Sequence, residues 1–573
     1  MDPSKTKEYM LVDPKTGDGH RGSLKFMYDL ARGKGKWKDS RTVSELALDE
    51  DETKDDTTWQ QRMSLLLCKL MWTIHGPLTA FGAGLVYILN LIDANDGVFK
   101  TLGRALVNRS ALVVRDPKSA EHKTLFAIAD PRFDLQVHAP PRPRTLNAAP
   151  SAVFFPGEDY GALGTADVSI MAAKLAYENQ AFIERVVTET WKMNFVGFYS
   201  CWNQFTGRSG TQFFIFTDQP KDAKAIVVAW RGTESFNGYD WSTDFDFSWY
   251  KLQGMGLVHI GFLEALGLVD RNSMESFTKL ETNCAKGRGK DSKSGLSAEV
   301  RRNRQLAYDK ATAVVKELMA ANPEAKLFVT GHSLGGSLAA LYTTLLFHSN
   351  EEAATSKLGA LYTFGQPRVG GLDFSQYMIS KIGENRYWRI VYLNDLVPRI
   401  PFDDRLFQFK HSGLCYYFDA RYGGKVRASS ILATHLELPI ASVLVSPLCS
   451  IVTFADSARV FGAVQTLAEA PNPNFFSLTS IVTDRVVALY ELVRSPFFRW
   501  LYGPEYAENF VTFIVRVLGI VVPGISCHFL NNYVNAVRLG PSPLVAKLHE
   551  EVHEIESWWS KKFPWFSRSR KTQ

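Results

Sequence analysis

The feature that most constrains the fold is a serine between two glycines, at the point where an extended run gives way to a helical one. Residues 326–331, KLFVTG, have the composition of a buried strand, and residues 334–347 have that of an apolar helix. The sequence Gly-His-Ser-Leu-Gly joins them through a sharp turn in which larger side chains would collide with the backbone. This junction predicts a sheet whose strands lead into helices, with Ser333 presented at the turn as a candidate nucleophile.

The same alternation continues along most of the chain. Short apolar runs rich in β-branched residues alternate with segments of helical period, which is typical of a largely parallel sheet. The runs that we predict to be strands are 225–230, 326–331, 360–365, 389–394 and 515–522. The pattern predicts an α/β domain over residues 151–545, with an apolar insertion at 441–507.

The N-terminal part of the chain has a different character. Residues 1–56 are polar, whereas residues 70–92 contain no Asp, Glu, Lys or Arg and are long enough to cross a bilayer core. A Gly-Pro pair at 76–77 interrupts this stretch, so a bent helix or a hairpin dipping into one leaflet competes with a straight span. A buried core helix is a further alternative. We favour a monotopic membrane-associating region at 57–150.

Composition narrows the classes of protein and partner. The 573 residues carry a net charge of +6 with basic and acidic residues interspersed, so no nucleic-acid partner is expected. The six cysteines form no C-x-x-C pair and the N-terminus has no cleavable signal, which favours reduced thiols in a cytosol-facing protein. Residues 139–150 are Pro-rich and predict a linker, and the basic, aromatic tail at 546–573 suits an anionic lipid surface.

A serine hydroxyl becomes a strong nucleophile only when an imidazole accepts its proton and a carboxylate orients that imidazole. In a fold of this kind the chain order is serine, acid, histidine. Asp395 directly follows the predicted strand 389–394, where sites of parallel sheets gather, and is the predicted acid. His528, in the loop after the predicted strand 515–522, is the predicted base. His411 is the rival, but it lies in a run of alternating apolar residues that suits a structural histidine better.

Two further patterns match motifs of other chemistry and are not expected to act. Residues 549–553 fit the H-E-x-x-H zinc motif, but no third ligand follows them and the segment has the charge pattern of an amphipathic helix. Residues 17–22 fit G-x-G-x-x-G, but no convincing strand precedes them. We therefore expect neither a metal nor a cofactor.

Seven separated motifs stand in order along the chain: VVAWRGTESFNGYDWSTDFDFSWY, VHIGFLEAL, TGHSLGGSLAAL, YTFGQPRVGG, YLNDLVPRIP, FKHSGLCYYF and PGISCHFLNNYVNAVRLG. Together they resemble the class 3 (fungal-type) lipase family and, within it, the plant oil-body lipases. The resemblance implies an α/β-hydrolase fold and a triad of Ser333, Asp395 and His528, in agreement with the choice made from the residues. It also implies an oxyanion hole formed by Thr233 and the backbone N–H of Leu334.

The resemblance further implies a lid over residues 236–250, an amphipathic cover that opens on a lipid surface. Aromatic residues alternate there with aspartates, and the lid residues are Phe236, Trp241, Phe245, Phe247 and Trp249. A helix packed permanently on the core is the alternative.

The function that the resemblance implies is hydrolysis of triacylglycerol through an acyl-enzyme, on the cytosolic face of a lipid droplet or oil body. A phospholipase A1 or galactolipase would use the same triad on another headgroup. A lipid-droplet scaffold that has lost catalysis would keep only the membrane binding. The expected partners are a lipid substrate and a membrane or droplet surface, and the sequence specifies no oligomeric state.

Overall fold

The computed structural model describes the body of the chain and the N-terminal apolar region. Its described residues are 9–10, 59–107, 111–135, 161–285, 292–401, 403, 408–418, 420, 422, 424–427, 478–503, 506–522 and 524–539. The polar segment apart from residues 9–10, the Pro-rich linker, the C-terminal tail and the two patterns at 17–22 and 549–553 lie outside the described residues.

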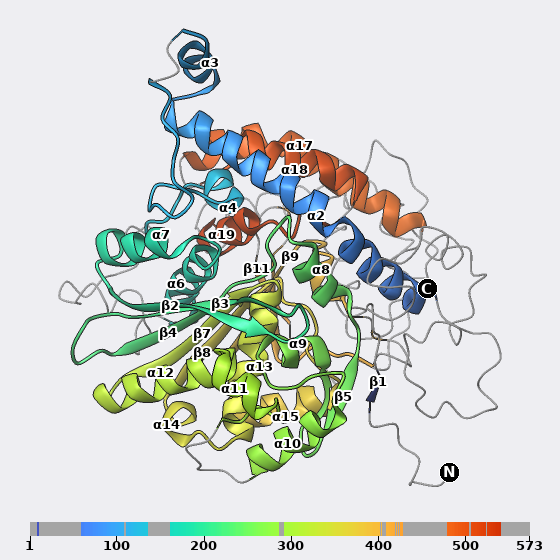
Figure 1. Cartoon of the computed structure of the whole chain (residues 1–573). Helices are drawn as coiled ribbons and strands as arrows, with labels where there is room; N and C mark the ends of the chain where they lie inside the picture. The colour runs from blue at the N-terminus through green and yellow to red at the C-terminus, as the bar shows by residue number, and fades with distance from the viewer. Residues whose placement is uncertain are drawn as a thin grey trace, which may run out of the picture.

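An eight-stranded sheet forms the centre of the fold (Figure 1). Its strands are β2 Asn194–Asn203, β3 Arg208–Thr217, β4 Ala225–Trp230, β7 Lys326–His332, β8 Leu358–Phe364, β9 Tyr387–Tyr392, β10 Leu414–Phe418 and β11 Gly424–Arg427. They lie in the order β11-β10-β9-β8-β7-β4-β3-β2, in which every neighbouring pair from β10 to β4 is parallel. Antiparallel pairs complete both edges. The predicted α/β class with a largely parallel sheet is confirmed.

Four of the five predicted strands are confirmed, as β4, β7, β8 and β9. The fifth is wrong: residues 515–522 lie almost entirely in a helix, α18 (Phe510–Val521), which begins with a capping box between Asn509 and Thr512. A short apolar run rich in β-branched residues suits a buried strand and an apolar helix equally well, so periodicity alone does not separate the two.

Helices cover both faces of the sheet (Figure 1). One buried apolar cluster joins the sheet to α6 (Gly161–Leu175), α7 (Gln180–Arg185) and α19 (Leu530–Leu539). A second cluster joins the other face to α12 (Ala307–Ala321), α13 (Leu334–His348) and α15 (Leu372–Ile382). The shorter helical segments are α4 Leu125–Ala129, η5 Val186–Thr190, α9 Ile260–Ala265, α10 Met274–Ala285, α11 Ala298–Asn303, α14 Glu352–Thr355 and η6 Val397–Arg399.

A small antiparallel sheet stands beside this body. It consists of β1 (Tyr9–Met10), β5 (Trp249–Leu252) and β6 (Gly256–His259), with β5 in the middle. The hairpin of β5 and β6 comes shortly after a short helix, α8 (Gly238–Phe245), which falls within the predicted lid.

The apolar N-terminal stretch forms one long helix, α2 (Trp59–Ala94), which continues through Pro77 and is followed by α3 (Val98–Val107). By length and composition alone, residues 66–94 could cross a membrane, and only 11% of their most apolar window is buried. The hairpin and the buried core helix are therefore wrong as alternatives. Helix α2 runs along the upper edge of the molecule in Figure 1 and packs against α8.

The described part of the predicted insertion contains α17 (Leu478–Tyr502), a helix that packs against α18. Both helices reach the same upper edge as α2 in Figure 1. Helices α2 and α18 also share a neighbour, because each of them contacts the short helix α4. The insertion therefore adds to the edge of the molecule that holds the N-terminal apolar helix.

Candidate active site

Ser333 lies at the junction of β7 and α13, in a strained backbone conformation. Its φ of 59° and ψ of −134° are rare for a residue with a side chain. The neighbouring glycines make this turn possible, because a Cβ on Gly331 would collide with the backbone of Gly335, and a Cβ on Gly335 with the carbonyl oxygen of Trp230. The local sequence therefore presents the Ser333 hydroxyl at the carboxyl end of a central strand and the beginning of a helix.

The structure brings the three predicted triad residues together. His528 Nε2 lies 2.8 Å from Ser333 Oγ, and His528 Nδ1 lies 2.7 Å from Asp395 Oδ2. Because an ionised carboxylate only accepts hydrogen bonds, Nδ1 carries the ring proton and Nε2 is left to accept the proton of the serine. All three side chains are buried. This is the geometry of a serine nucleophile with its base and its orienting acid.

Asp395 is held by two further groups. Its Oδ1 accepts a hydrogen bond from the backbone N–H of Val397 at 2.9 Å, and its Oδ2 accepts one from the hydroxyl of Tyr533 on α19. Gly365, with φ at 58°, leaves room for this cluster, since a Cβ there would come within 3.0 Å of Tyr533, Asp395 and His528. The acid is therefore fixed on both oxygens before any substrate binds.

A second histidine, His332, stacks on His528 with ring centroids 4.6 Å apart. Its Nε2 donates a hydrogen bond to the backbone carbonyl of His528 at 3.1 Å, and its Nδ1 accepts one from the hydroxyl of Tyr177 at 2.9 Å. Burial lowers the pKa of His332 well below its usual value, and the neighbouring His528 adds to this shift. His332 thus supports the loop of His528 as a neutral ring.

The two predicted oxyanion donors come from elements next to Ser333. Leu334 begins α13, and the first N–H groups of a helix have no acceptor within the helix. Thr233 follows β4, the strand that pairs with β7, and a hydrogen bond of 2.6 Å joins its Oγ1 to Asp244 Oδ2. Burial raises the pKa of Asp244 to about 8. Below that pKa the acid is protonated and can donate to Thr233 in place of accepting from it, and the threonine proton is then available to the oxyanion that the resemblance predicts.

The predicted lid residues are divided between two elements. Phe236 precedes α8, and Trp241 stacks on Phe245 within that helix at a centroid distance of 6.0 Å. Phe247 and Trp249 are buried, and Trp249 is already the first residue of β5. The helical part of the predicted lid therefore ends with α8, and the rest belongs to the β5–β6 hairpin and the residues before it.

Helix α2 lies directly on α8. Trp72 Nε1 donates a hydrogen bond to Ser242 Oγ at 2.6 Å, and Ser64 Oγ donates one to the carbonyl oxygen of Phe245 at 2.6 Å. The ring of Tyr239 on α8 also lies 4.5 Å from the ring of Trp72. Helices α2 and α8 are therefore in direct contact through both polar and aromatic groups.

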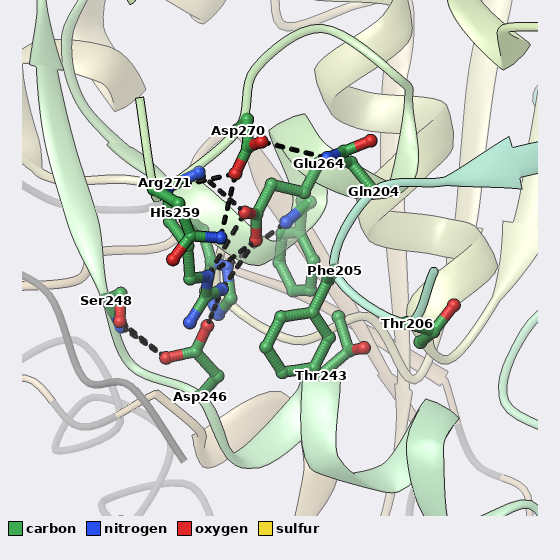
Figure 2. A network of polar contacts seen from close by, with 12 residues as sticks. Gln204, Phe205, Thr206, Thr243, Asp246, Ser248, His259, Glu264, Asp270 and Arg271 are labelled. Atoms are coloured by element: carbon green, nitrogen blue, oxygen red, sulfur yellow. Dashed lines mark hydrogen bonds and ion pairs between the residues drawn. The ribbon is translucent and has the colours of Figure 1, made fainter. Parts of the chain in front are cut away.

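A buried ion-pair network fixes the chain immediately after α8. Arg271 Nη2 lies 2.5 Å from Asp246 Oδ2 and 2.6 Å from Glu264 Oε2, and Figure 2 shows both carboxylates converging on the guanidinium. Asp246 also accepts a hydrogen bond from the hydroxyl of Ser248 at 2.5 Å. Burial lowers the pKa of His259, in the same cluster, to about 4, so its ring is neutral. Loss of one partner would leave a buried charge unpaired, so this network holds the chain in place at the end of α8.

The rival histidine is bonded to another part of the chain, and His528 is the imidazole that contacts Ser333. His411 is buried just before β10, and its Nε2 donates a hydrogen bond to the carbonyl oxygen of Pro398 at 2.5 Å. Across the described ranges, no group of three or more His, Cys, Asp or Glu side chains could hold a metal ion.

Sequence reasoning missed three groups at the site: Tyr533, His332 and Asp244. Each lies inside a stretch that we had singled out, respectively the segment after His528, the glycine-serine turn and the lid. Their position inside these stretches is the signal that the sequence offers for them. Their partners are distant in sequence, so no spacing rule assigns them.

Comparisons with known proteins match the chain to one family. A family model described as "Lipase (class 3)" matches residues 227–405. The chain is 33% identical to "Triacylglycerol lipase OBL1" of Arabidopsis thaliana, over 94% of this chain and 96% of that protein. The chain belongs to the class 3 lipase family. This lipase is 35% identical to the protein of the same name from Ricinus communis, over 83% and 86% of the two chains.

The resemblance to the class 3 lipases, and within them to the plant oil-body lipases, is thus confirmed. The protein is a serine ester hydrolase with an α/β-hydrolase fold. Among solved structures, the triacylglyceride lipase of Rhizomucor miehei is 24% identical and covers 45% of this chain and 78% of its own, with a TM-score of 0.31.

Proposed function

We propose that this lipase hydrolyses triacylglycerol at the cytosolic face of a lipid-droplet surface, with Ser333 as the nucleophile, His528 as the base and Asp395 as the orienting acid. The observation that carries the proposal is the unbroken series of hydrogen bonds from Ser333 through His528 to Asp395. The names of the two plant relatives support the substrate class.

The geometry suits a two-step acyl transfer. His528 Nε2 accepts the proton of Ser333 as Oγ attacks the ester carbonyl, and then gives that proton to the departing alcohol. Water, activated by the same imidazole, then releases the fatty acid from the acyl-enzyme. Asp395 stays ionised and stabilises the imidazolium. The N–H of Leu334 and the hydroxyl of Thr233 stabilise the negative charge on the carbonyl oxygen.

The contact between α2 and α8 supports a lipid surface as the place of action. Ser333 and His528 are buried, and Asp244 of α8 contacts Thr233 beside the nucleophile, so we infer that a large ester needs α8 to move. The exposed apolar side of α2 favours insertion of this helix into a lipid monolayer. Because α2 packs on α8, its insertion would act directly on the cover of the active site.

The test compares fatty-acid release from triolein emulsions with release from phospholipid and galactolipid vesicles. We expect hydrolysis of triolein and a loss of at least about 1,000-fold in the Ser333→Ala variant, because the oxyanion hole and binding alone retain little catalysis. Activity that survives in Ser333→Ala would exclude the proposed triad. A preference for vesicles would assign the enzyme to phospholipid or galactolipid hydrolysis.

A fluorophosphonate probe tests whether the serine is reactive at all. We expect the wild-type protein to be labelled in the presence of lipid and Ser333→Ala to remain unlabelled. An unlabelled wild-type protein would favour the scaffold without catalysis.

A further inference from the structure

Helix α17 exposes a stripe of large apolar side chains. The exposed residues follow one another at intervals of three or four, which places them on one side of the helix, and they are Val486, Leu489, Val493, Phe497 and Trp500. Val493 is 74% exposed and Trp500 is 78% exposed. An ordinary surface helix of a soluble protein presents polar residues to the outside, so this helix is the reverse of the usual pattern.

The inner side of α17 holds two charged groups beside apolar side chains. Glu491 and Arg494 are buried, with Arg494 Nη2 lying 3.1 Å from Glu491 Oε1. The hydroxyl of Tyr392, at the end of β9, donates to Glu491 Oε1 at 2.7 Å. Val487, Ala488 and Phe498 are buried on the same side, so the inner face combines apolar side chains with an ion pair, whereas the outer face is apolar.

Helix α18 has the same reversed arrangement. Its outer face is formed by Phe510, Phe513, Ile514, Val517, Leu518 and Val521, all exposed at helical spacing. Its inner face holds Arg516, which is buried and lies 3.0 Å from Glu491 on α17. Arg516 Nε also donates to Glu508 Oε1 at 2.6 Å. The buried ion pair of Arg516 with Glu491 thus joins the two helices from the inside.

A continuous apolar exterior, with buried ion pairs beneath it, fits a hydrocarbon solvent rather than water. Helix α18 has 12 residues and is about 18 Å long, well short of the ~30 Å of a bilayer core, so it suits one leaflet and does not span. Trp500 and the exposed Arg499 at the end of α17 suit the headgroup level of such a surface.

The end of α18 leads directly to the proposed base. Ile525, after the end of α18, is still exposed, and His528 follows three residues later. Arg516 Nη2 donates to Asn532 Oδ1 at 3.0 Å, and Asn532 Nδ2 in turn donates to the carbonyl oxygen of Ser526 at 2.6 Å. The inner face of α18 therefore holds the loop that carries His528.

We propose that α17 and α18 form a second lipid-docking element, which seats its exposed apolar side chains among the acyl chains of a phospholipid monolayer. Docking would place the loop of His528 directly beneath that surface. The inference builds on the lipid-surface location proposed above and adds an element that acts together with α2. Helices α2 and α18 both contact α4, so the exposed face of α18 continues from the helix that we propose to enter lipid. This continuity favours lipid over a second copy of the chain as the occupant.

The test places an environment-sensitive fluorophore on α18 of the full chain. Leu518, 54% exposed, is replaced by cysteine and labelled with nitrobenzoxadiazole in the Ser333→Ala background, so that no hydrolysis changes the lipid. The matched control is Leu372→Cys on α15, where the leucine is 49% exposed. The probe surface is a triolein droplet coated with phosphatidylcholine. The cysteines of the described residues are buried, so unlabelled Ser333→Ala protein treated with the reagent sets the background.

We expect a blue shift and a several-fold rise in emission from the α18 label on droplets, and no change from the α15 label. An α18 label that responds no more than the α15 label would overturn the proposal. A response that appears without lipid, as the protein concentration rises, would assign the face to a second copy and would also overturn it.

Flotation of a double variant, Val493→Glu with Leu518→Glu, provides a second measurement. Both residues are exposed, so the fold should persist, and hydrolysis of the soluble ester p-nitrophenyl butyrate checks this. We expect the droplet-bound fraction to fall at least tenfold, with Leu372→Glu unchanged; an unchanged bound fraction in the double variant would contradict the proposal. Neither the label nor the flotation measurement needs catalysis. If the protein enters lipid but the wild-type enzyme does not cleave triolein, the proposed reaction is wrong and the docking proposal stands.

Discussion

The helices on either side of the reacting groups, α13 and α18, are both strongly apolar, yet they face opposite environments. Helix α13 begins beside Ser333 and is buried on all sides from Leu334 to Leu346. Helix α18 ends shortly before His528 and exposes its apolar face while burying Arg516. The apolar character of a helix therefore indicates that it avoids water. Whether its apolar face packs against protein or faces another solvent depends on the neighbouring elements.

The two triad residues are also held in different ways. Backbone geometry fixes Ser333, since the turn packs so closely on the neighbouring backbone that only glycine fits at 331 and 335. Side-chain hydrogen bonds and packing fix His528, through Asp395, Tyr533 and the stacked His332. The serine side should therefore be sensitive to packing, and the histidine side to the loss of single polar groups.

The largest expected effect compares one leucine from each helix. Leu341→Ala on α13 removes a fully buried side chain and should lower the free energy of unfolding by about 2–5 kcal/mol. Leu518→Ala on α18 removes a side chain that is half exposed in water and should cost below about 1 kcal/mol. Urea unfolding of both variants measures the difference. Equal losses would show that the outer face of α18 is covered in solution, and the comparison would fail.

The next effect concerns the histidine side. Tyr533→Phe removes a hydrogen bond to the Asp395 carboxylate, and such bonds to charged groups contribute about 1.5–3 kcal/mol. We expect kcat on a soluble ester to fall about tenfold with KM nearly unchanged, because the acid that orients His528 is held less firmly. Steady-state kinetics checks this, with thermal unfolding as the control for folding. A full kcat in the variant would make Tyr533 a packing residue only.

The smallest effect is a dependence on pH at the oxyanion hole. Burial raises the pKa of Asp244 to about 8, so above that pH the carboxylate accepts the proton of Thr233 and competes with the oxyanion. We expect kcat on a soluble ester to fall several-fold above pH 8, and Asp244→Asn to remove that alkaline limb. The same shift should lower the free energy of unfolding as pH rises toward 8, because the carboxyl ionises first in the unfolded chain.

An alkaline limb that persists in Asp244→Asn would assign the titration to another group. The variant keeps the size of the side chain and still offers a donor to Thr233, so its activity at neutral pH serves as the internal control.

Local geometry explains why much of the fold was predictable. The turn around Ser333 needs small neighbours, and four strands follow from runs that are buried on both faces of the sheet. Chain order and position after a strand selected Asp395. Chain order also selected His528, although the strand predicted before it is the helix α18, and the structure places the two side chains within hydrogen-bonding distance of each other. These inferences needed only short segments and a known order.

The misassigned strand at 515–522 shows where such reasoning ends. Val517 and Leu518 are exposed and Arg516 is buried, so a rule that apolar residues turn inward reads this segment in reverse. The contact of α2 with α8 was equally out of reach, because Trp72 and Ser242 are 170 residues apart. Long-range contacts and a second solvent are properties of the assembled structure, and no local pattern reports them.

The packing of α2 on α8 also makes the opening of the predicted lid measurable through one cysteine. The Cys68 thiol is fully buried at this contact, and donates a hydrogen bond to the carbonyl oxygen of Ser242 at 3.5 Å. Burial raises its pKa well above the usual value, which makes it inert while the two helices stay together. The rate at which an alkylating reagent modifies Cys68 therefore reports how often α8 and α2 separate. If a lipid surface moves α8 away from α2, the alkylation rate of Cys68 should rise.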